Sequence, residues 1–176
     1  MIRTLGRWSK PSRRLFLVTW VASLALLQHA WSSYGDAPEI LAERGALVML
    51  SIAMVLAPWG AGPAVMVLLQ RMSSGGVNLP YAEYWFTGER RPSSLDRLSP
   101  YLDGMGTLLT VFLAGVLALF VGERIDPRLS LYSAVAFLGL NIAFLGGVVW
   151  WVRRVMAAFP APEPSTRGIK RFRRRR

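Results

Sequence analysis

Residues 46–69 read ALVMLSIAMVLAPWGAGPAVMVLL and contain no formally charged side chain. A helix rises about 1.5 Å per residue, so this stretch reaches roughly 36 Å, which exceeds a hydrocarbon core of about 30 Å. Three more uncharged apolar stretches have spanning or near-spanning length: residues 15–31, 105–122 and 131–152. The pattern predicts an all-α membrane protein, a bundle of four transmembrane helices.

The composition agrees with a membrane protein and excludes several kinds of site. Of the 176 residues, 53% are hydrophobic and 18% are charged, whereas soluble domains carry about 25% charged residues. The chain has no Cys and one His. These counts exclude disulfides, metal centres built on thiolates and metal sites that need several histidines.

The distribution of basic residues predicts how the bundle is oriented. Of the 21 Lys and Arg residues, all but Arg44, Arg124 and Arg128 fall in residues 1–14, 71–104 and 153–176. Short loops rich in Lys and Arg stay in the cytoplasm, so we expect both termini on the inner side of a bacterial inner membrane. The same rule accounts for the net charge of +11, and we therefore expect no binding to nucleic acid.

The second span, residues 46–69, contains Pro58-Trp-Gly-Ala-Gly-Pro63 at its middle. Each Pro removes a backbone donor and each Gly loosens the helix, so we expect a kink or a break in this helix. Broken helices line the sites of transporters. Pro and Gly are also tolerated in ordinary membrane spans. A kink without a substrate site is therefore the simpler interpretation of this segment.

The longest connection is the predicted cytoplasmic loop 71–104, which carries Tyr81, Tyr84, Trp85 and Phe86. Three placements are open for these aromatic side chains: the headgroup level, the underside of the bundle, or a docking patch for another protein. Residues 95–98 have the pattern of a short amphipathic helix, and Pro100 is expected to interrupt the chain before the third span.

The fourth span carries candidate contacts for other helices. Gly139, Ala143 and Gly147 recur every four residues and share one face, where small side chains let another helix approach. Asn141 lies near the middle and is expected to seek a hydrogen-bond partner on a neighbouring helix. Packing inside the bundle is the alternative for both features. Trp150 and Trp151 close the span as an aromatic belt, and Arg153 and Arg154 follow.

The chain divides into a basic lead-in (1–14), a membrane domain (15–155) and a segment of Pro-rich spacer and polybasic tail (156–176). The tail has too little apolar surface to fold alone. Its basic residues are expected to adhere to anionic lipid headgroups, with an acidic partner protein as the alternative. The residues concerned are Lys170, Arg171, Arg173, Arg174, Arg175 and Arg176.

Residues 77–91 read VNLPYAEYWFTGERR. This stretch resembles the loop N-x-P-x-(K/R)-(D/E)-Y-W-L-A-P-E-R-R of a bacterial family of small, uncharacterised four-helix membrane proteins. That family is related to the domain of unknown function at the N-terminus of Sdp-type immunity and signalling proteins. The resemblance implies a four-helix fold and no catalytic residue, and residues 29–38 match the family's exported H-F-G-x-x-G-x-P loop only in part. The matching loop residues are Asn78, Pro80, Glu83, Tyr84, Trp85, Glu89, Arg90 and Arg91.

The sequence offers little for catalysis. No predicted span contains Asp, Glu, Lys or Arg, and the Ser and Thr residues of the spans have no His or Lys near them to act as a base. We therefore expect no enzyme. His29, near the exported end of the first span, is a candidate ligand for a pigment metal or a haem iron; otherwise no cofactor is expected beyond a pigment or a lipid.

These observations favour a non-catalytic accessory or scaffold subunit of a larger bacterial membrane complex, for which a photosynthetic or respiratory complex is a candidate host. Other membrane-protein subunits would be its partners. One alternative is a signalling or immunity-type protein that senses a peptide or protein at the exported loop 32–45. A second is a small transporter whose site is the interrupted second span.

Overall fold

The computed structural model describes residues 11–34 and 41–162, and within these ranges the chain forms helices and no strand. The long helices are α1 (Pro11–Tyr34), α2 (Leu41–Trp59), α5 (Arg90–Ile125) and α6 (Ser130–Ala158). The shorter elements are the π-helix η3 (Gly60–Ala64), α3 (Val65–Arg71), α4 (Ala82–Trp85) and the 3-10 turns η4 (Ser74–Gly76) and η5 (Pro127–Leu129).

Four helical segments are long and apolar enough to cross a membrane, as predicted. The helices extend beyond the predicted spans because helix formation continues through charged residues that hydropathy excludes. α1, for example, begins at Pro11, a residue suited to the first turn of a helix. The four segments are Pro11–Ser32, Gly45–Arg71, Arg90–Glu123 and Tyr132–Ala158.

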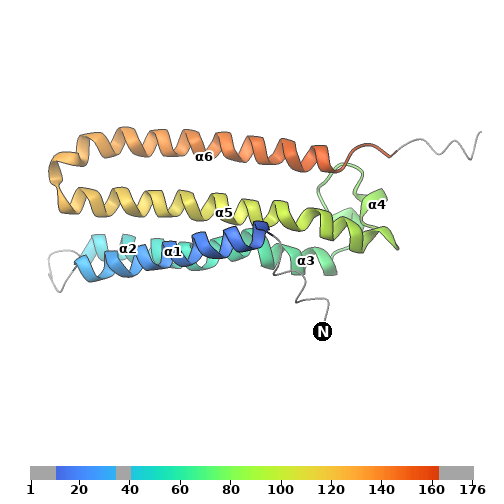
Figure 1. The fold of residues 1–176 in the computed structure, drawn as a ribbon, viewed down its shortest axis with the longest axis horizontal. Coiled ribbons are helices and arrows are strands. Elements are labelled where there is room, and N and C mark those ends of the chain that lie inside the picture. The colour runs from blue at the N-terminus through green and yellow to red at the C-terminus, as the bar shows by residue number, and fades with distance from the viewer. Residues whose placement is uncertain (1–10, 35–40, 163–176) are drawn as a thin grey trace, which may run out of the picture.

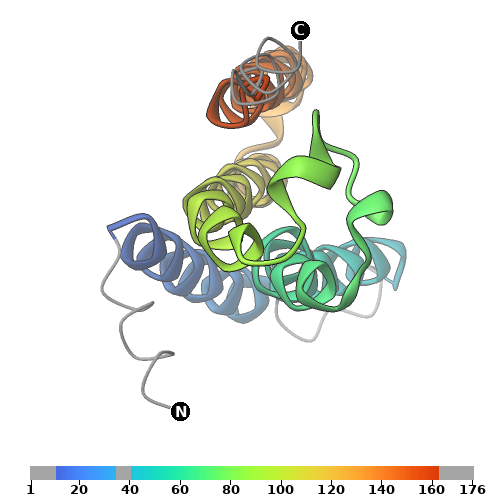
Figure 2. The same ribbon diagram turned by 90° about the vertical axis from the view of Figure 1, so that its right-hand side faces the viewer.

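The central helix is α5 (Figures 1 and 2). It packs against α1, α2, η3 and α3 on one side and against α6 on the other. Among the described helices, α6 runs alongside α5 only, and its last turns also share an apolar core with α3 and the 72–89 connection. We call the end of the bundle where α1 begins and α6 ends the terminal end, and the end that holds η5 the turn end.

Two apolar cores hold the helices together. The first joins α1, α2 and α5 around the fully enclosed Leu47 and Leu117. The second, which we call the terminal core, joins α3, the 72–89 connection, α5 and the end of α6. Its buried members are Met66, Val77, Ala82, Phe86, Leu95, Leu98, Leu102, Val155 and Phe159.

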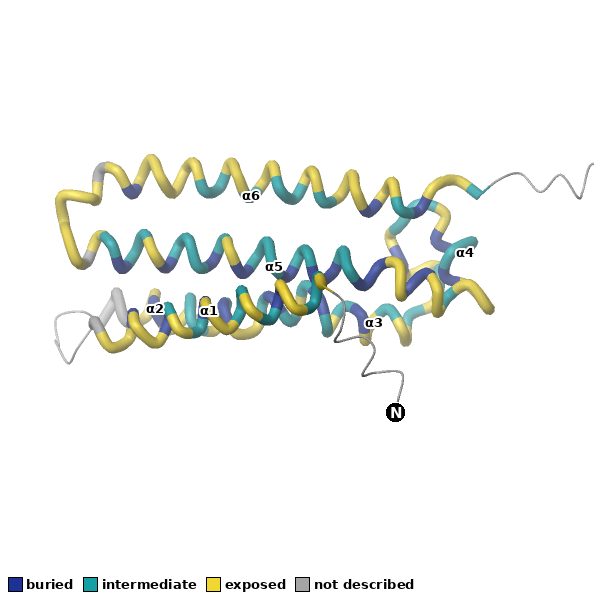
Figure 3. The backbone as a smooth tube through the Cα atoms, viewed as in Figure 1, coloured by how far each residue is buried: buried dark blue, intermediate teal, exposed yellow. Residues whose placement is uncertain are grey.

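Many large apolar side chains are exposed along the long helices, as a bilayer requires, and α6 is the least enclosed helix (Figure 3). None of its most apolar 18-residue window is buried inside the protein, against 22–28% in the other three spans. The part of α6 that α5 does not cover therefore faces lipid or another polypeptide.

The second span does not break at Pro58 and Pro63. The chain stays helical from Leu41 to Arg71, and η3 carries it past Pro63 as a π-helical turn. In a π-helical turn the N–H group bonds to the carbonyl five residues back instead of four. The wider turn accommodates Pro63, which has no N–H to donate. Gly62 lies in this turn, and a Cβ there would stand 3.3 Å from the carbonyl oxygen of Leu102. The wide turn thus brings η3 close to α5, and a bend in the helix axis stays a prediction.

The predicted loop 71–104 is shorter than expected, because α5 already begins at Arg90. Pro92 occupies the first turn, where an N–H has no helical partner in any case. Pro100 lies inside α5 and does not interrupt it, so that prediction was wrong. Leu95, Leu98 and Leu102 are buried in the terminal core on either side of Pro100, and their burial offsets one lost backbone bond.

Candidate functional site

The aromatic residues of the 77–92 segment are partly internal. Phe86 is 1% exposed, and its ring lies 5.6 Å from that of Phe159, which is also 1% exposed. The Trp85 ring lies 5.9 Å from Phe159, and its Nε1 donates to the carbonyl oxygen of Pro160 at 3.2 Å. Phe86 is therefore enclosed by this chain, as in the alternative that places it on the underside of the bundle, and is not available to a partner.

Tyr81 and Tyr84 lie closer to the surface. Tyr81 has the left-handed φ of 55° and its side chain is 52% exposed. Tyr84 is half-buried, and the guanidinium of the exposed Arg90 lies 4.0 Å from its ring centre. Docking of another protein on Tyr81, Tyr84 and Arg90 stays a prediction.

Two arginines of α5 cap the ends of neighbouring helices. Arg91 donates from Nη2 to the carbonyl oxygens of Leu69, at 2.7 Å, and of Met72, both at the end of α3. Arg97 donates from Nη1 to the carbonyl oxygen of Ala158, the last residue of α6, at 3.1 Å. Helix ends leave carbonyl groups without partners, and a cation there also opposes the helix dipole. Arg91, predicted as a partner contact, thus has an internal structural role.

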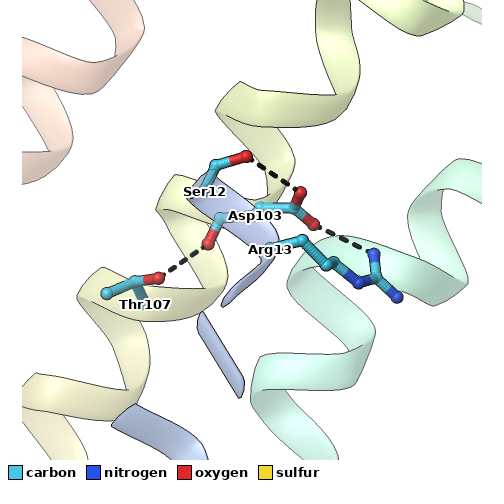
Figure 4. Close-up of polar contacts among 4 residues, drawn as sticks. All are labelled: Ser12, Arg13, Asp103 and Thr107. Atoms are coloured by element: carbon cyan, nitrogen blue, oxygen red, sulfur yellow. Dashed lines mark hydrogen bonds and ion pairs between the residues drawn. The ribbon is translucent and has the colours of Figure 1, made fainter. Parts of the chain in front are cut away.

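A buried ion pair joins the start of α1 to α5 (Figure 4). Arg13 Nη1 lies 3.0 Å from Asp103 Oδ1, and Ser12 Oγ donates to Asp103 Oδ2 at 3.3 Å. Asp103 is 3% exposed and stands on a helix, whereas the sequence places every carboxylate in a loop. The two oxygens are thus engaged by α1, and the pair fixes the terminal end of α1.

The predicted small-residue face of the fourth span is divided between two environments. A Cβ on Gly147 would stand 2.9 Å from Leu108 Cδ1, so Gly147 packs against α5. A Cβ on Gly139 would meet nothing within 4 Å, and Ala143 is exposed. Asn141 Nδ2 donates to the carbonyl oxygen of Phe137, one turn back in its own helix, at 2.7 Å. A bond from Asn141 to a neighbouring helix stays a prediction.

Clefts lie between α5 and α6 at both ends of their contact. The cleft at the terminal end has a volume of about 540 Å³, and we call it the terminal cleft. A smaller cleft of about 220 Å³ at the turn end lies between Ala118 and Gly122 of α5 and Tyr132 and Ala136 of α6. The residues that line the terminal cleft are Arg97, Pro100, Tyr101, Gly104, Trp150, Trp151 and Arg154.

Small residues of α6 lie between these two clefts along the helix. Tyr132 and Ala136 line the cleft at the turn end and Trp150 lines the terminal cleft, and positions 139, 143 and 146 continue their 3- and 4-residue spacing on the same side of a helix. A Cβ on Gly146, like one on Gly139, would meet nothing within 4 Å. We call Gly139, Ala143 and Gly146 the small-residue stripe. It replaces the predicted face that contained Gly147.

Two arginines that line the terminal cleft, Arg97 and Arg154, are not identified as a site by the sequence. Arg97 falls in the predicted loop 71–104, and Arg154 follows the predicted fourth span as one of the basic residues that indicate orientation. The signal that could have joined them is the spacing of Arg97, Pro100 and Gly104, which puts them on one helix face only if the helix begins before Arg97.

His29 is exposed on α1, and its carbonyl oxygen accepts a hydrogen bond from Ser32 Oγ at 2.7 Å. Ligation of a pigment metal by its imidazole stays a prediction. The groups of His, Asp and Glu in the described residues include no cluster that would hold a metal ion. The polybasic tail, from Lys170 to Arg176, lies outside the described residues.

Comparisons of the chain with protein-family models, with curated proteins and with solved structures found no match. We therefore infer the function from the geometry of this chain alone.

Proposed function

We propose that this chain is a non-catalytic accessory or scaffold subunit of a larger bacterial membrane complex, and that α6 is the helix that docks against its neighbours. Among the described helices, α6 runs alongside α5 alone, apart from the terminal core that its last turns share with α3 and the 72–89 connection. Lipid would cover the apolar surface of α6 in any case, so its exposure alone does not indicate a partner. The observation that supports docking is the open small-residue stripe of Gly139, Ala143 and Gly146.

Small residues matter because association of helices inside a bilayer gains little from the hydrophobic effect. It depends on close van der Waals contact, which Gly and Ala permit because they let two backbones approach. An added Cβ at Gly139 or Gly146 would meet no atom of this chain within 4 Å. In the described part of the chain, no other helix therefore stands within 4 Å of such a Cβ to block the close approach of a helix from another subunit.

The remaining parts of the proposal are orientation, partners and host. We place both termini in the cytoplasm of a bacterial inner membrane, on the basis of the Lys and Arg distribution. The exposed Tyr81 and the polybasic tail would add contacts on that side. Membership of the four-helix family that the loop 77–91 resembles is part of the same proposal.

The alternatives have less support from the described contacts. The transporter alternative depended on a broken second span, and that span is continuously helical. The signalling alternative depends on the exported loop 32–45, of which residues 35–40 lie outside the described residues.

The test is to extract the protein from its native membrane in a mild detergent, to measure the native mass and to identify co-purifying proteins by mass spectrometry. We expect a stoichiometric complex that Gly139→Leu with Gly146→Leu dissociates. The matched control is Leu138→Phe with Leu145→Phe, which adds bulk to side chains that are each 61% exposed on α6. A protein that migrates as a lone monomer from native membranes contradicts the proposal. An absorption spectrum of the same sample tests His29 as a pigment ligand.

A further inference from the structure

We propose that the terminal cleft between α5 and α6 is a binding site for an anionic phospholipid, with the phosphate held between Arg97 and Arg154. This site does not depend on the docking function proposed above, because its lining contains none of Gly139, Ala143 and Gly146 and its binding is measured on the isolated chain.

The charge of the cleft is the first observation. Two guanidinium groups, those of Arg97 and Arg154, line one cleft, and no carboxylate lines it. The ion pair among the described residues joins Arg13 to Asp103 and involves neither of these arginines. Arginine binds phosphate oxygens with two parallel N–H donors, so two such groups at one cleft fit a phosphodiester.

The cleft is also held in shape by contacts of its own walls. Trp151 Nε1 donates to the carbonyl oxygen of Tyr101 at 2.6 Å, which joins α6 to α5 at the floor. The guanidinium of Arg154 lies 5.2 Å from the ring centre of Trp150. Arg97 uses one N–H group on Ala158, as described above, and this anchors its side chain while other donors remain. A preorganised site loses less entropy on binding.

The position of the cleft fits a lipid rather than a soluble anion. Trp150 and Trp151 are the kind of side chain that gathers at headgroup level, and Trp150 is 60% exposed. Towards the turn end the cleft reaches Gly104 of α5, where an added Cβ would meet nothing within 4 Å. An acyl chain could therefore leave the cleft past Gly104 while its phosphate stays at the arginines.

The size of the cleft agrees with this ligand. Its volume of about 540 Å³ falls within the range of roughly 300–1,000 Å³ that small-molecule sites occupy. The apolar floor of Pro100, Tyr101 and Gly104 suits the glycerol backbone and the first methylene groups.

The experiment measures lipid binding to the full purified chain by native mass spectrometry, with phosphatidylglycerol and phosphatidylcholine as the two probes. We expect phosphatidylglycerol to bind more tightly. Arg97→Gln with Arg154→Gln should weaken it about tenfold or more, because each lost contact is a charge-assisted hydrogen bond. The matched control, Arg90→Gln with Arg153→Gln, removes the same charge from exposed arginines that do not line the cleft, and it should leave binding nearly unchanged.

A second variant keeps both arginines and blocks the cleft by volume. Gly104→Leu places a side chain in open space, so the helix should fold normally while phosphatidylglycerol is excluded. Arg154 caps no helix end in the described residues, whereas Arg97 does. Weaker binding by Arg154→Gln alone would therefore show that loss of the Arg97 cap is not the cause. Thermal unfolding in detergent confirms that each variant is folded.

Several outcomes would overturn the proposal. Equal weakening by the two double variants would indicate general attraction of lipid to a basic surface. Equal binding of both lipids would remove the phosphate specificity. Full displacement of phosphatidylglycerol by inorganic phosphate would identify a soluble anion as the ligand. Release of a co-purified polypeptide, instead of a lipid, by Gly104→Leu would assign the cleft to a partner protein.

Discussion

The guanidinium of Arg13, near the start of α1, lies 3.0 Å from the carboxylate of Asp103 in α5, and the two side chains are 16% and 3% exposed. Ninety positions separate them in the sequence. Removing charges from water is costly, and the cost is recovered only when the partners stay together. This pair therefore constrains how α1 is placed against α5 more than it adds to stability.

Asp103→Asn should destabilise the protein by about 3 kcal/mol, because it removes a carboxylate from a guanidinium that stays at a poorly hydrated position. The measurement is thermal unfolding in detergent. Glu89→Gln, which neutralises an exposed carboxylate at the same end of the bundle, is the control and should change little. Replacing both partners, Arg13→Met with Asp103→Leu, should recover most of the loss. A double variant as unstable as Asp103→Asn would contradict this account of the pair.

The pair also shows which parts of the fold could be predicted from the sequence. The four spans were predictable because hydropathy is a local property of each helix. The Arg13–Asp103 contact was not predictable, because its partners are far apart in the chain and Asp103 falls in the predicted loop 71–104, beyond the interruption expected at Pro100. A proline inside a helix costs one backbone hydrogen bond and some strain. The burial of Leu95, Leu98 and Leu102 in the terminal core outweighs this cost, and that burial depends on contacts with distant parts of the chain.

The candidate site divides in the same way. The small residues of the fourth span were recognised from their spacing, but spacing alone could not say that Gly147 faces Leu108 while Gly139 faces open space. That distinction depends on which side of α6 meets α5. Asn141 shows the same limit, since its position in the span does not predict that Nδ2 bonds to a carbonyl one turn away in its own helix.

Gly106→Ala should destabilise the bundle. A Cβ there would stand 2.9 Å from Phe16 Cε2 and 3.2 Å from the carbonyl oxygen of Pro58. Phe16 is 0% exposed, so its ring has little room to move, and overpacking of this kind costs roughly 1–3 kcal/mol. Unfolding in detergent provides the measurement.

The control for Gly106→Ala lies on the same helix. Gly122 has nothing within 4 Å of an added Cβ, so Gly122→Ala should stabilise α5 by about 0.5–1 kcal/mol through the lower conformational entropy of the unfolded chain. If the two alanine variants behaved alike, α5 would not approach α1 and α2 as closely as described.

Phe86→Ala should loosen the terminal core. The buried ring of Phe86 lies in the connection between α3 and α5 and contacts the ring of Phe159, which follows α6. Removing a buried Phe ring costs about 3–5 kcal/mol. The expected results are a lower unfolding temperature and faster protease cleavage within residues 72–89. Phe137→Ala removes the same ring from a 48% exposed position on α6 and should do neither. Undiminished protection of residues 72–89 in Phe86→Ala would show that this contact does not hold the connection in place.

The orientation of the bundle can be tested directly, because the chain has no Cys of its own. Glu89→Cys reports the terminal end and Arg128→Cys the turn end, and both positions are exposed. If Lys and Arg set the topology, a membrane-impermeant maleimide should label Arg128→Cys in cells whose outer membrane is permeabilised, and Glu89→Cys only after the inner membrane is opened. The reverse pattern would put the terminal cleft and its arginines on the outer face. Its anionic lipid would then come from the outer leaflet, so this measurement also decides which leaflet supplies the ligand.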